Sequence, residues 1–84
     1  MSMKFLVEVS LPAAQKHFDM RIPADSQWGE ITELVAAIAE DLSGGSFRSS
    51  AQTVLCNADT GEFYDINMSA VSQGIRNGSH LILI

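Results

Sequence analysis

The sequence predicts an α+β fold in which a mixed sheet of four to five strands carries one helix across one of its faces. Only one segment, 26–42, is long and periodic enough for a full helix, and apolar residues elsewhere fall in short runs typical of strands. The final run, 79–84, ends in four successive apolar residues, which indicates a strand in the middle of a sheet. With 84 residues there is room for one core, so residues 1–84 are expected to form one domain.

Two strands are predicted near the start of the chain, over 4–10 and 17–22. Apolar and polar residues alternate in both runs, and the apolar side chains are expected to face the helix: Phe5, Val7, Val9, Phe18, Met20 and Ile22. Pro12 interrupts the alternation between the two runs. A break this short predicts a turn, so the two strands should form an antiparallel hairpin.

The helix is predicted over 26–42. Its bulky apolar residues recur at steps of three and four, which places them on one face: Trp28, Ile31, Val35, Ile38 and Leu42. Ser26 is expected to be the N-cap, because its hydroxyl can accept a hydrogen bond from a backbone N–H of the first turn. Gly44 and Gly45 follow, where a left-handed residue can end the helix.

Two short strands are predicted after the helix. The polar loop 43–50 contains one large apolar residue, Phe47, which is expected to cover the edge of the core. A third strand is predicted over 53–57, and a fourth over 62–66 with Phe63 or Tyr64 directed inward. Residues 58–61 between them have the composition of a turn.

The segment 67–74 has no strand alternation. Met68 and Val71 are three residues apart, which predicts one helical turn packed on the core, and Ile75 is expected to fill the end of the sheet. Asn77-Gly78 predicts a turn with positive φ that directs the last strand back into the sheet.

The order of these elements predicts the topology. If the last strand is central, it lies beside the first strand and parallel to it, with the helix and the third strand in the connection. This arrangement is the β-grasp.

Composition excludes several classes of partner. The formal net charge of −5 opposes binding to nucleic acid and to anionic membranes. No apolar run approaches the length of a membrane span, and no signal-type segment follows the N-terminus, so we expect a cytoplasmic protein without membrane insertion. Cys56 is the single cysteine, which excludes an internal disulfide and a multi-cysteine metal site.

No catalytic arrangement is evident in the sequence. Asp59-Thr60-Gly61 matches the triplet of aspartic proteases, but its neighbours favour a hairpin turn. His17 and His80 have no partner at metal-ligand spacing and no local nucleophile motif. We therefore expect no enzyme activity and no catalytic, cofactor-binding or metal site.

The best candidate for a functional feature is an apolar patch on the outer face of the sheet. If Leu81 and Leu83 face the helix, then neighbouring side chains of the last strand face away from it, next to the first and third strands. The candidate contact residues are Leu6, Val54, Ile82 and Ile84. A contiguous apolar patch favours a protein contact, either with another protein or in a homodimer through the open sheet face.

Two segments resemble the YukD/EsaB family of small ubiquitin-like proteins, which is associated with bacterial type VII secretion. FDMRIPAD at 18–25 is similar to that family's second strand, and VSQGIRNGSHLILI at 71–84 is similar to its Gly-Ile signature and terminal strand. The resemblance implies a cytosolic accessory or regulatory protein that contacts secretion-system components noncovalently. Ubiquitin and its sulfur-carrier relatives act through a tail ending in Gly-Gly, whereas Gly44-Gly45 follows the helix here, so the chain is not expected to be a conjugated modifier.

Two alternatives stay open at this point. The chain could be the small β-grasp subunit of a multicomponent enzyme such as a bacterial diiron monooxygenase, which neighbouring genes would reveal. It could also be a modifier whose tail lies beyond Ile84, which the intact mass of the native protein would reveal.

Overall fold

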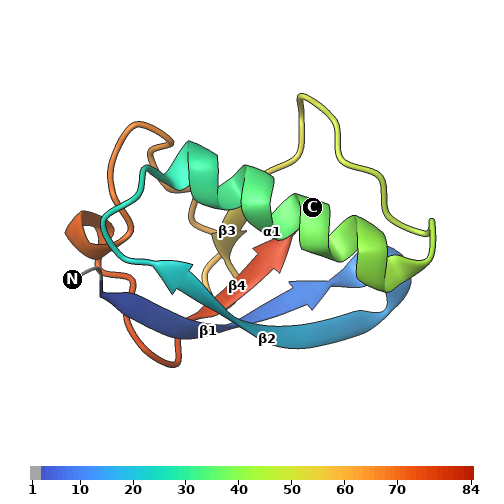
Figure 1. The fold of residues 1–84 in the computed structure, drawn as a ribbon, viewed down its shortest axis with the longest axis horizontal. Helices are drawn as coiled ribbons and strands as arrows, with labels where there is room; N and C mark the ends of the chain where they lie inside the picture. Colours follow the sequence, from blue (N-terminus) through green and yellow to red (C-terminus); the bar gives the residue numbers. More distant parts are fainter. Residues whose placement is uncertain (1–2) are drawn as a thin grey trace.

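In the computed structural model, which describes residues 3–84, one four-stranded sheet carries a single long helix on one face (Figure 1). In chain order the elements are β1 Lys4–Leu11, the 3₁₀ turn η1 Pro12–Ala14, β2 Lys16–Pro23, α1 Trp28–Ser43, β3 Leu55–Asn57, the 3₁₀ turn η2 Val71–Gln73 and β4 His80–Leu83. The strand order is β2-β1-β4-β3. β4 is parallel to β1, while the β1–β2 and β3–β4 pairs are antiparallel, as the predicted β-grasp requires.

The hairpin follows the predicted alternation. Phe5, Val7, Val9 and Ile22 are buried, whereas Phe18 and Met20 are half-buried because they lie on an edge strand. The strands are longer than predicted, and Leu11 at the end of β1 is also buried.

The core face of α1 differs from the predicted face at its C-terminal end. Trp28, Ile31 and Val35 are buried as expected, but Leu42 is 47% exposed and Ala39 is fully buried. A strict seven-residue repeat drifts by about 20° per heptad on a straight helix. Two heptads after Trp28, this drift has carried Leu42 away from the core, so the prediction for Leu42 was wrong.

The ends of α1 are formed in different ways. The predicted N-cap, Ser26, is wrong, because the N-cap is Gln27 and its side chain makes no capping hydrogen bond. At the other end Gly44 adopts the left-handed conformation, with φ of 62°, as predicted.

Backbone carbonyls from a distant segment accept hydrogen bonds from N–H groups in the first turn of α1. The N–H of Trp28 donates to the oxygen of Met68 at 2.8 Å, and that of Gly29 donates to the oxygen of Ile66 at 2.9 Å. A Cβ at Gly29 would lie 3.3 Å from that Ile66 oxygen, so the glycine permits the close approach. The segment around residue 67 therefore replaces a side-chain cap.

The second half of the chain has less regular structure than predicted. The third strand is confirmed but covers only Leu55–Asn57, and 62–66 is not a strand, because only an isolated bridge joins Cys56 to Phe63. Phe63 is 67% exposed, while Tyr64 is half-buried with its ring centroid 4.8 Å from that of Trp28. Tyr64, and not Phe63, is therefore the inward aromatic residue.

The predicted helical turn is present as η2, but its contacts with the core differ. Met68 and Val71 are exposed, and Ala70 and Ile75 are the buried residues of this region. The prediction for Ile75 is confirmed, and so is the burial of Phe47 in the loop after α1. Gly78 has a φ of 87°, as the turn before β4 requires.

Trp28 links the helix to the far edge of the sheet. Its side chain is 1% exposed, and its indole Nε1–H donates to the carbonyl oxygen of Leu55 in β3 at 2.8 Å. Because β3 is short, this buried hydrogen bond and the contact with the Tyr64 ring hold the edge strand against α1.

We expect Trp28→Phe to lower the free energy of unfolding by about 2–4 kcal/mol, because it removes buried ring volume and leaves the Leu55 carbonyl without its donor. Urea denaturation followed by far-UV circular dichroism measures this loss. Tyr64→Phe is the control, because it removes only a hydroxyl that bonds Asn57 at 3.2 Å. An equal loss in both variants would contradict the role assigned to the indole N–H.

Candidate protein-contact surface

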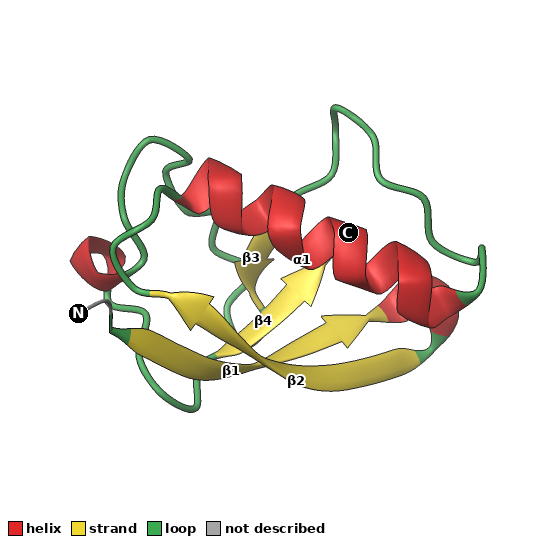
Figure 2. Cartoon of the chain, in the orientation of Figure 1, coloured by secondary structure: helices red, strands yellow, loops and turns green. Residues whose placement is uncertain are grey.

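The outer face of the sheet lies opposite α1, and in the described part of the chain no helix covers it (Figure 2). Side chains that alternate along each strand with those facing α1 are directed to this face. On β1 they are Leu6, Glu8 and Ser10, on β2 His17, Asp19 and Arg21, on β4 His80 and Ile82, and on β3 Cys56. The face is therefore apolar near the end of β4 and polar toward its start.

The register brings three of the four predicted contact residues to the same end of the sheet. Ile82 is half-buried and lies between Ser10 of β1 and Cys56 of β3. Ile84, 53% exposed, continues the ladder, because its N–H donates to the oxygen of Val54 and its own oxygen accepts from the Val54 N–H.

Leu6 lies apart from these residues. The carbonyl oxygen of Leu6 accepts a hydrogen bond from the N–H of Gly78. Further along the two strands, Glu8 pairs with His80, and Ser10 pairs with Ile82. The Glu8–His80 pair therefore separates Leu6 from Ile82, and the contiguity expected from the sequence extends only to the other three residues. β1 and β4 are far apart in the chain, so the periodicity of each strand alone could not show this parallel register.

Val54 has a second environment. It is half-buried and lines a groove of about 600 Å³ between α1 and the segment 49–54, together with Thr32 and Ile66. It therefore joins the outer sheet face to the side of the helix.

Phe63 is an apolar residue of this surface, although the sequence also allowed it to face inward as the alternative to Tyr64. It bridges to Cys56, so it lies on the row that contains Ile82. The turn composition of 58–61 could have predicted this outward position of Phe63, because a tight hairpin there pairs Phe63 with Cys56. Cys56 itself is 2% exposed, and burial raises the pKa of its thiol.

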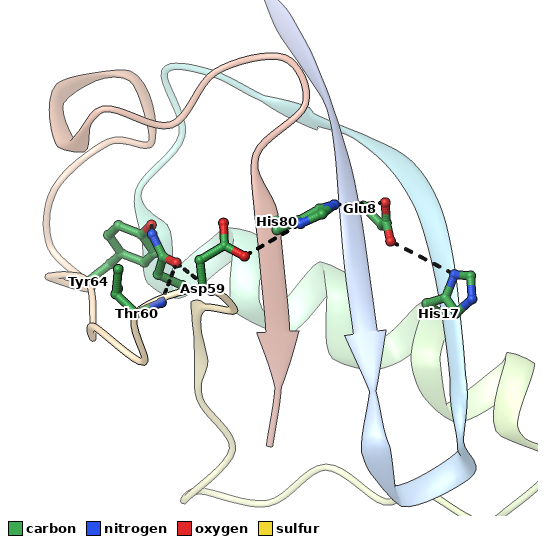
Figure 3. A network of polar contacts seen from close by, with 7 residues as sticks. Glu8, His17, Asp59, Thr60, Tyr64 and His80 are labelled. Carbon is green, nitrogen blue, oxygen red and sulfur yellow. Dashed lines mark hydrogen bonds and ion pairs between the residues drawn. The ribbon is translucent and has the colours of Figure 1, made fainter.

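A polar network crosses the middle of the same face (Figure 3). His80 Nε2 lies 2.9 Å from Glu8 Oε2, and His80 Nδ1 lies 3.7 Å from Asp59 Oδ1. His17 Nδ1 lies 4.0 Å from the other oxygen of Glu8. The hydrogen bond and charge of Glu8, with a smaller contribution from Asp59, raise the pKa of the His80 imidazole.

The sequence suggested that the histidines have no partner. Folding instead brings His80 next to Glu8, which is 72 positions away in the chain. Among residues 3–84 there is nevertheless no group of three or more His, Cys, Asp or Glu side chains arranged to hold a metal ion.

Asp59-Thr60-Gly61 forms the turn that the sequence favoured. The side-chain oxygen of Asn57 accepts the N–H of Asp59 at 2.8 Å and that of Thr60 at 3.0 Å. Gly61 has a φ of 74° and closes the turn. Asp59 is therefore part of a surface hairpin and contacts His80, not a second aspartate.

Solved structures show the same fold in secretion-system proteins. The ubiquitin-like domain of the Mycobacterium tuberculosis type VII secretion system protein EccD1 is 16% identical, with 98% of both chains covered and a TM-score of 0.75. The EccD5 ubiquitin-like domain from Mycobacterium xenopi is 19% identical, with 98% of this chain and 93% of that chain covered and a TM-score of 0.70.

The fold also occurs in an oxygenase complex. A chain of the toluene 4-monooxygenase HD complex is 10% identical, with 96% of both chains covered and a TM-score of 0.80. At such identities the likeness shows the fold alone, which is the ubiquitin-like β-grasp.

Comparison with curated protein sequences gives no match. In the described residues, no helix has the length and apolar character needed to cross a membrane. A family model, described as WXG100 protein secretion system (Wss) protein YukD, matches residues 6–83, which is nearly the whole chain. The match includes the segment 18–25 and all but the last residue of the segment 71–84 that suggested the resemblance. The chain belongs to the YukD family of ubiquitin-like proteins of the WXG100 secretion system.

Proposed function

We propose that this protein is a non-catalytic cytoplasmic accessory or regulator of a type VII secretion system that acts through noncovalent contacts with a protein component of that system. The observation that carries the proposal is the family match over residues 6–83, together with an apolar patch on the sheet face that α1 leaves uncovered. We call Val54, Phe63, Ile82 and Ile84 the β4 patch.

The β4 patch has the composition of a small protein interface. Phe63 and Ile84 are more than half exposed although both are large and apolar. On one side the patch is bordered by Glu8, Asp59 and His80. An apolar centre with a polar rim is the usual anatomy of a protein contact.

Two local features disfavour covalent chemistry by the residues described. Leu83 lies in β4, and Ile84 exchanges two backbone hydrogen bonds with Val54 at 2.9 and 3.0 Å. Both residues are held in the sheet, which disfavours their own use as a flexible reactive segment. The burial of Cys56 and the raised pKa of its thiol also disfavour its use as a nucleophile.

The second candidate is a small subunit of a multicomponent monooxygenase, which the likeness to the toluene 4-monooxygenase chain favours. That likeness concerns the fold, whereas the family match concerns this sequence. The proteins that bind the chain distinguish the two candidates.

The proposal is tested by affinity purification of the tagged chain from its native host, followed by mass spectrometry and a secretion assay in a deletion strain. We expect a secretion-system protein to copurify and secretion of small helical substrates to change in the deletion strain. Copurification of a diiron hydroxylase with unchanged secretion would overturn the proposal in favour of the second candidate.

We expect Ile82→Glu to leave the fold intact, because the side chain lies opposite the helix, and to weaken binding of the copurified partner by roughly tenfold or more. Circular dichroism checks the fold, and titration with the partner measures the affinity. Val71→Glu is the matched control, since it places the same charge on a half-exposed aliphatic residue of η2. An unfolded Ile82→Glu protein would show that this side chain belongs to the core.

The rim of the β4 patch predicts a pH dependence of stability. Because the folded state raises the pKa of His80, its protonated form is favoured in the folded protein. This stabilisation is fully present below the pKa of the unfolded state and is lost as the pH rises through the folded pKa. Urea unfolding across this window should therefore show a larger loss of stability with rising pH in the wild type than in His80→Gln.

The cause assigned to the raised pKa of His80 is tested by NMR titration of Glu8→Gln. The pKa of His80 should be lower in this variant than in the wild type, and an unchanged pKa would contradict the assigned cause.

A further inference from the structure

Among the described residues, no segment pairs with the outer edge of β2. This strand is the outermost of the sheet, with β1 on one side only (Figure 1). The N–H of Glu8 and the carbonyl of Leu6 bond toward β4, at Ser79 and Gly78, so the even-numbered residues of β1 face β4 and the odd-numbered ones face β2. In the β1–β2 register, each even-numbered residue of β1 lies opposite an odd-numbered residue of β2. The N–H and C=O groups of these odd-numbered β2 residues therefore point away from β1, toward the open edge of the sheet.

Three residues therefore present outward N–H and C=O groups: His17, Asp19 and Arg21. Pro23 contributes a carbonyl but has no N–H, which ends the donor series. Within residues 3–84 no hydrogen bond from another segment reaches these groups. Such an edge can accept another strand.

The side chains make this edge complementary to itself. Charged residues on an edge strand normally discourage pairing, but here opposite charges alternate on the outer face as Asp19 and Arg21. In an antiparallel pair about a two-fold axis at Met20, Asp19 of each copy lies opposite Arg21 of the other. Both residues point their backbone groups outward, so they form hydrogen-bonded pairs as well as ion pairs.

Other two-fold registers are less favourable. An axis at Asp19 places this carboxylate opposite its own copy, and an axis at Arg21 does the same for the guanidinium. An axis at Phe18 pairs His17 with Asp19 and leaves Arg21 without a carboxylate. The axis at Met20 is the register that gives two opposite-charge pairs without a repulsive one.

The helix adds an apolar strip beside the same edge. Leu34, Ile38 and Leu42 are spaced by four and share one side of α1. Leu34 lines a hollow with Pro23, and the carbonyl of Leu42 accepts Lys16 Nζ at 3.0 Å, so this side faces β2. Leu34 and Leu42 are 44% and 47% exposed.

We propose that the β2 edge is a homodimer interface, in which β2 pairs antiparallel with β2 of a second copy about Met20 and the two α1 strips adjoin across the axis. The half-buried Phe18 then lies opposite Ile22 of the other copy, on the side of the core. This interface is separate from the β4 patch and from the proposed secretion role, so each proposal can fail without the other.

The test is a charge exchange measured by sedimentation velocity over a wide range of concentration. We expect the wild type to dimerise, and Asp19→Arg and Arg21→Asp each to weaken the dimer by roughly tenfold, because each turns two attractive pairs into repulsive ones. The double variant D19R/R21D should recover the dimer. Glu62→Arg and Arg76→Asp make the same changes of charge elsewhere on the surface, so they should leave the strength of the dimer unchanged.

Hydrogen exchange identifies the contact independently. The amides of Asp19 and Arg21 should exchange more slowly as the concentration rises, while those of Phe18 and Met20 should not change, because they already bond to β1. A monomer at every concentration, or a dimer that neither single charge change weakens, would overturn the proposal.

Discussion

β4 lies between β1 and β3, and its parallel pairing with β1 determines what the outer face of the sheet presents. The register places His80 beside Glu8 and Ile82 beside Ser10, so a polar row and an apolar row follow one another along β4. The same pairing leaves β2 at one edge and the short β3 at the other. Both surfaces to which we assign contacts, the β4 patch and the β2 edge, therefore result from the position of one strand.

The layer opposite these surfaces is stabilised by contacts between distant segments. Carbonyls of Ile66 and Met68 accept the first N–H groups of α1, and the indole of Trp28 donates to Leu55. The irregular segment after β3 is thereby fixed without strand pairing of its own. One such layer covers a single face of the sheet, and the opposite face, which carries the β4 patch, is left uncovered by α1.

The sequence predicted the regular elements well, since their signals are local. The alternation of Phe5, Val7 and Val9 and the apolar run at the end of the chain were sufficient to predict the hairpin and the central strand. The prediction from sequence was wrong where hydrogen bonds to a distant segment replaced the usual side-chain cap of a helix. Ser26 was expected to cap the helix and does not, because carbonyls some forty residues away satisfy the first turn.

The sequence by itself determined the α+β class, the central place of the last strand, the inward side of the hairpin strands and of the last strand, and the family. The tertiary structure decided which outward residues are neighbours: it separated Leu6 from Ile82, added Phe63 to the apolar end, and joined His80 to Glu8. The physical reason is that alternation along a strand selects a face, whereas a position on that face depends on the register between strands far apart in the chain.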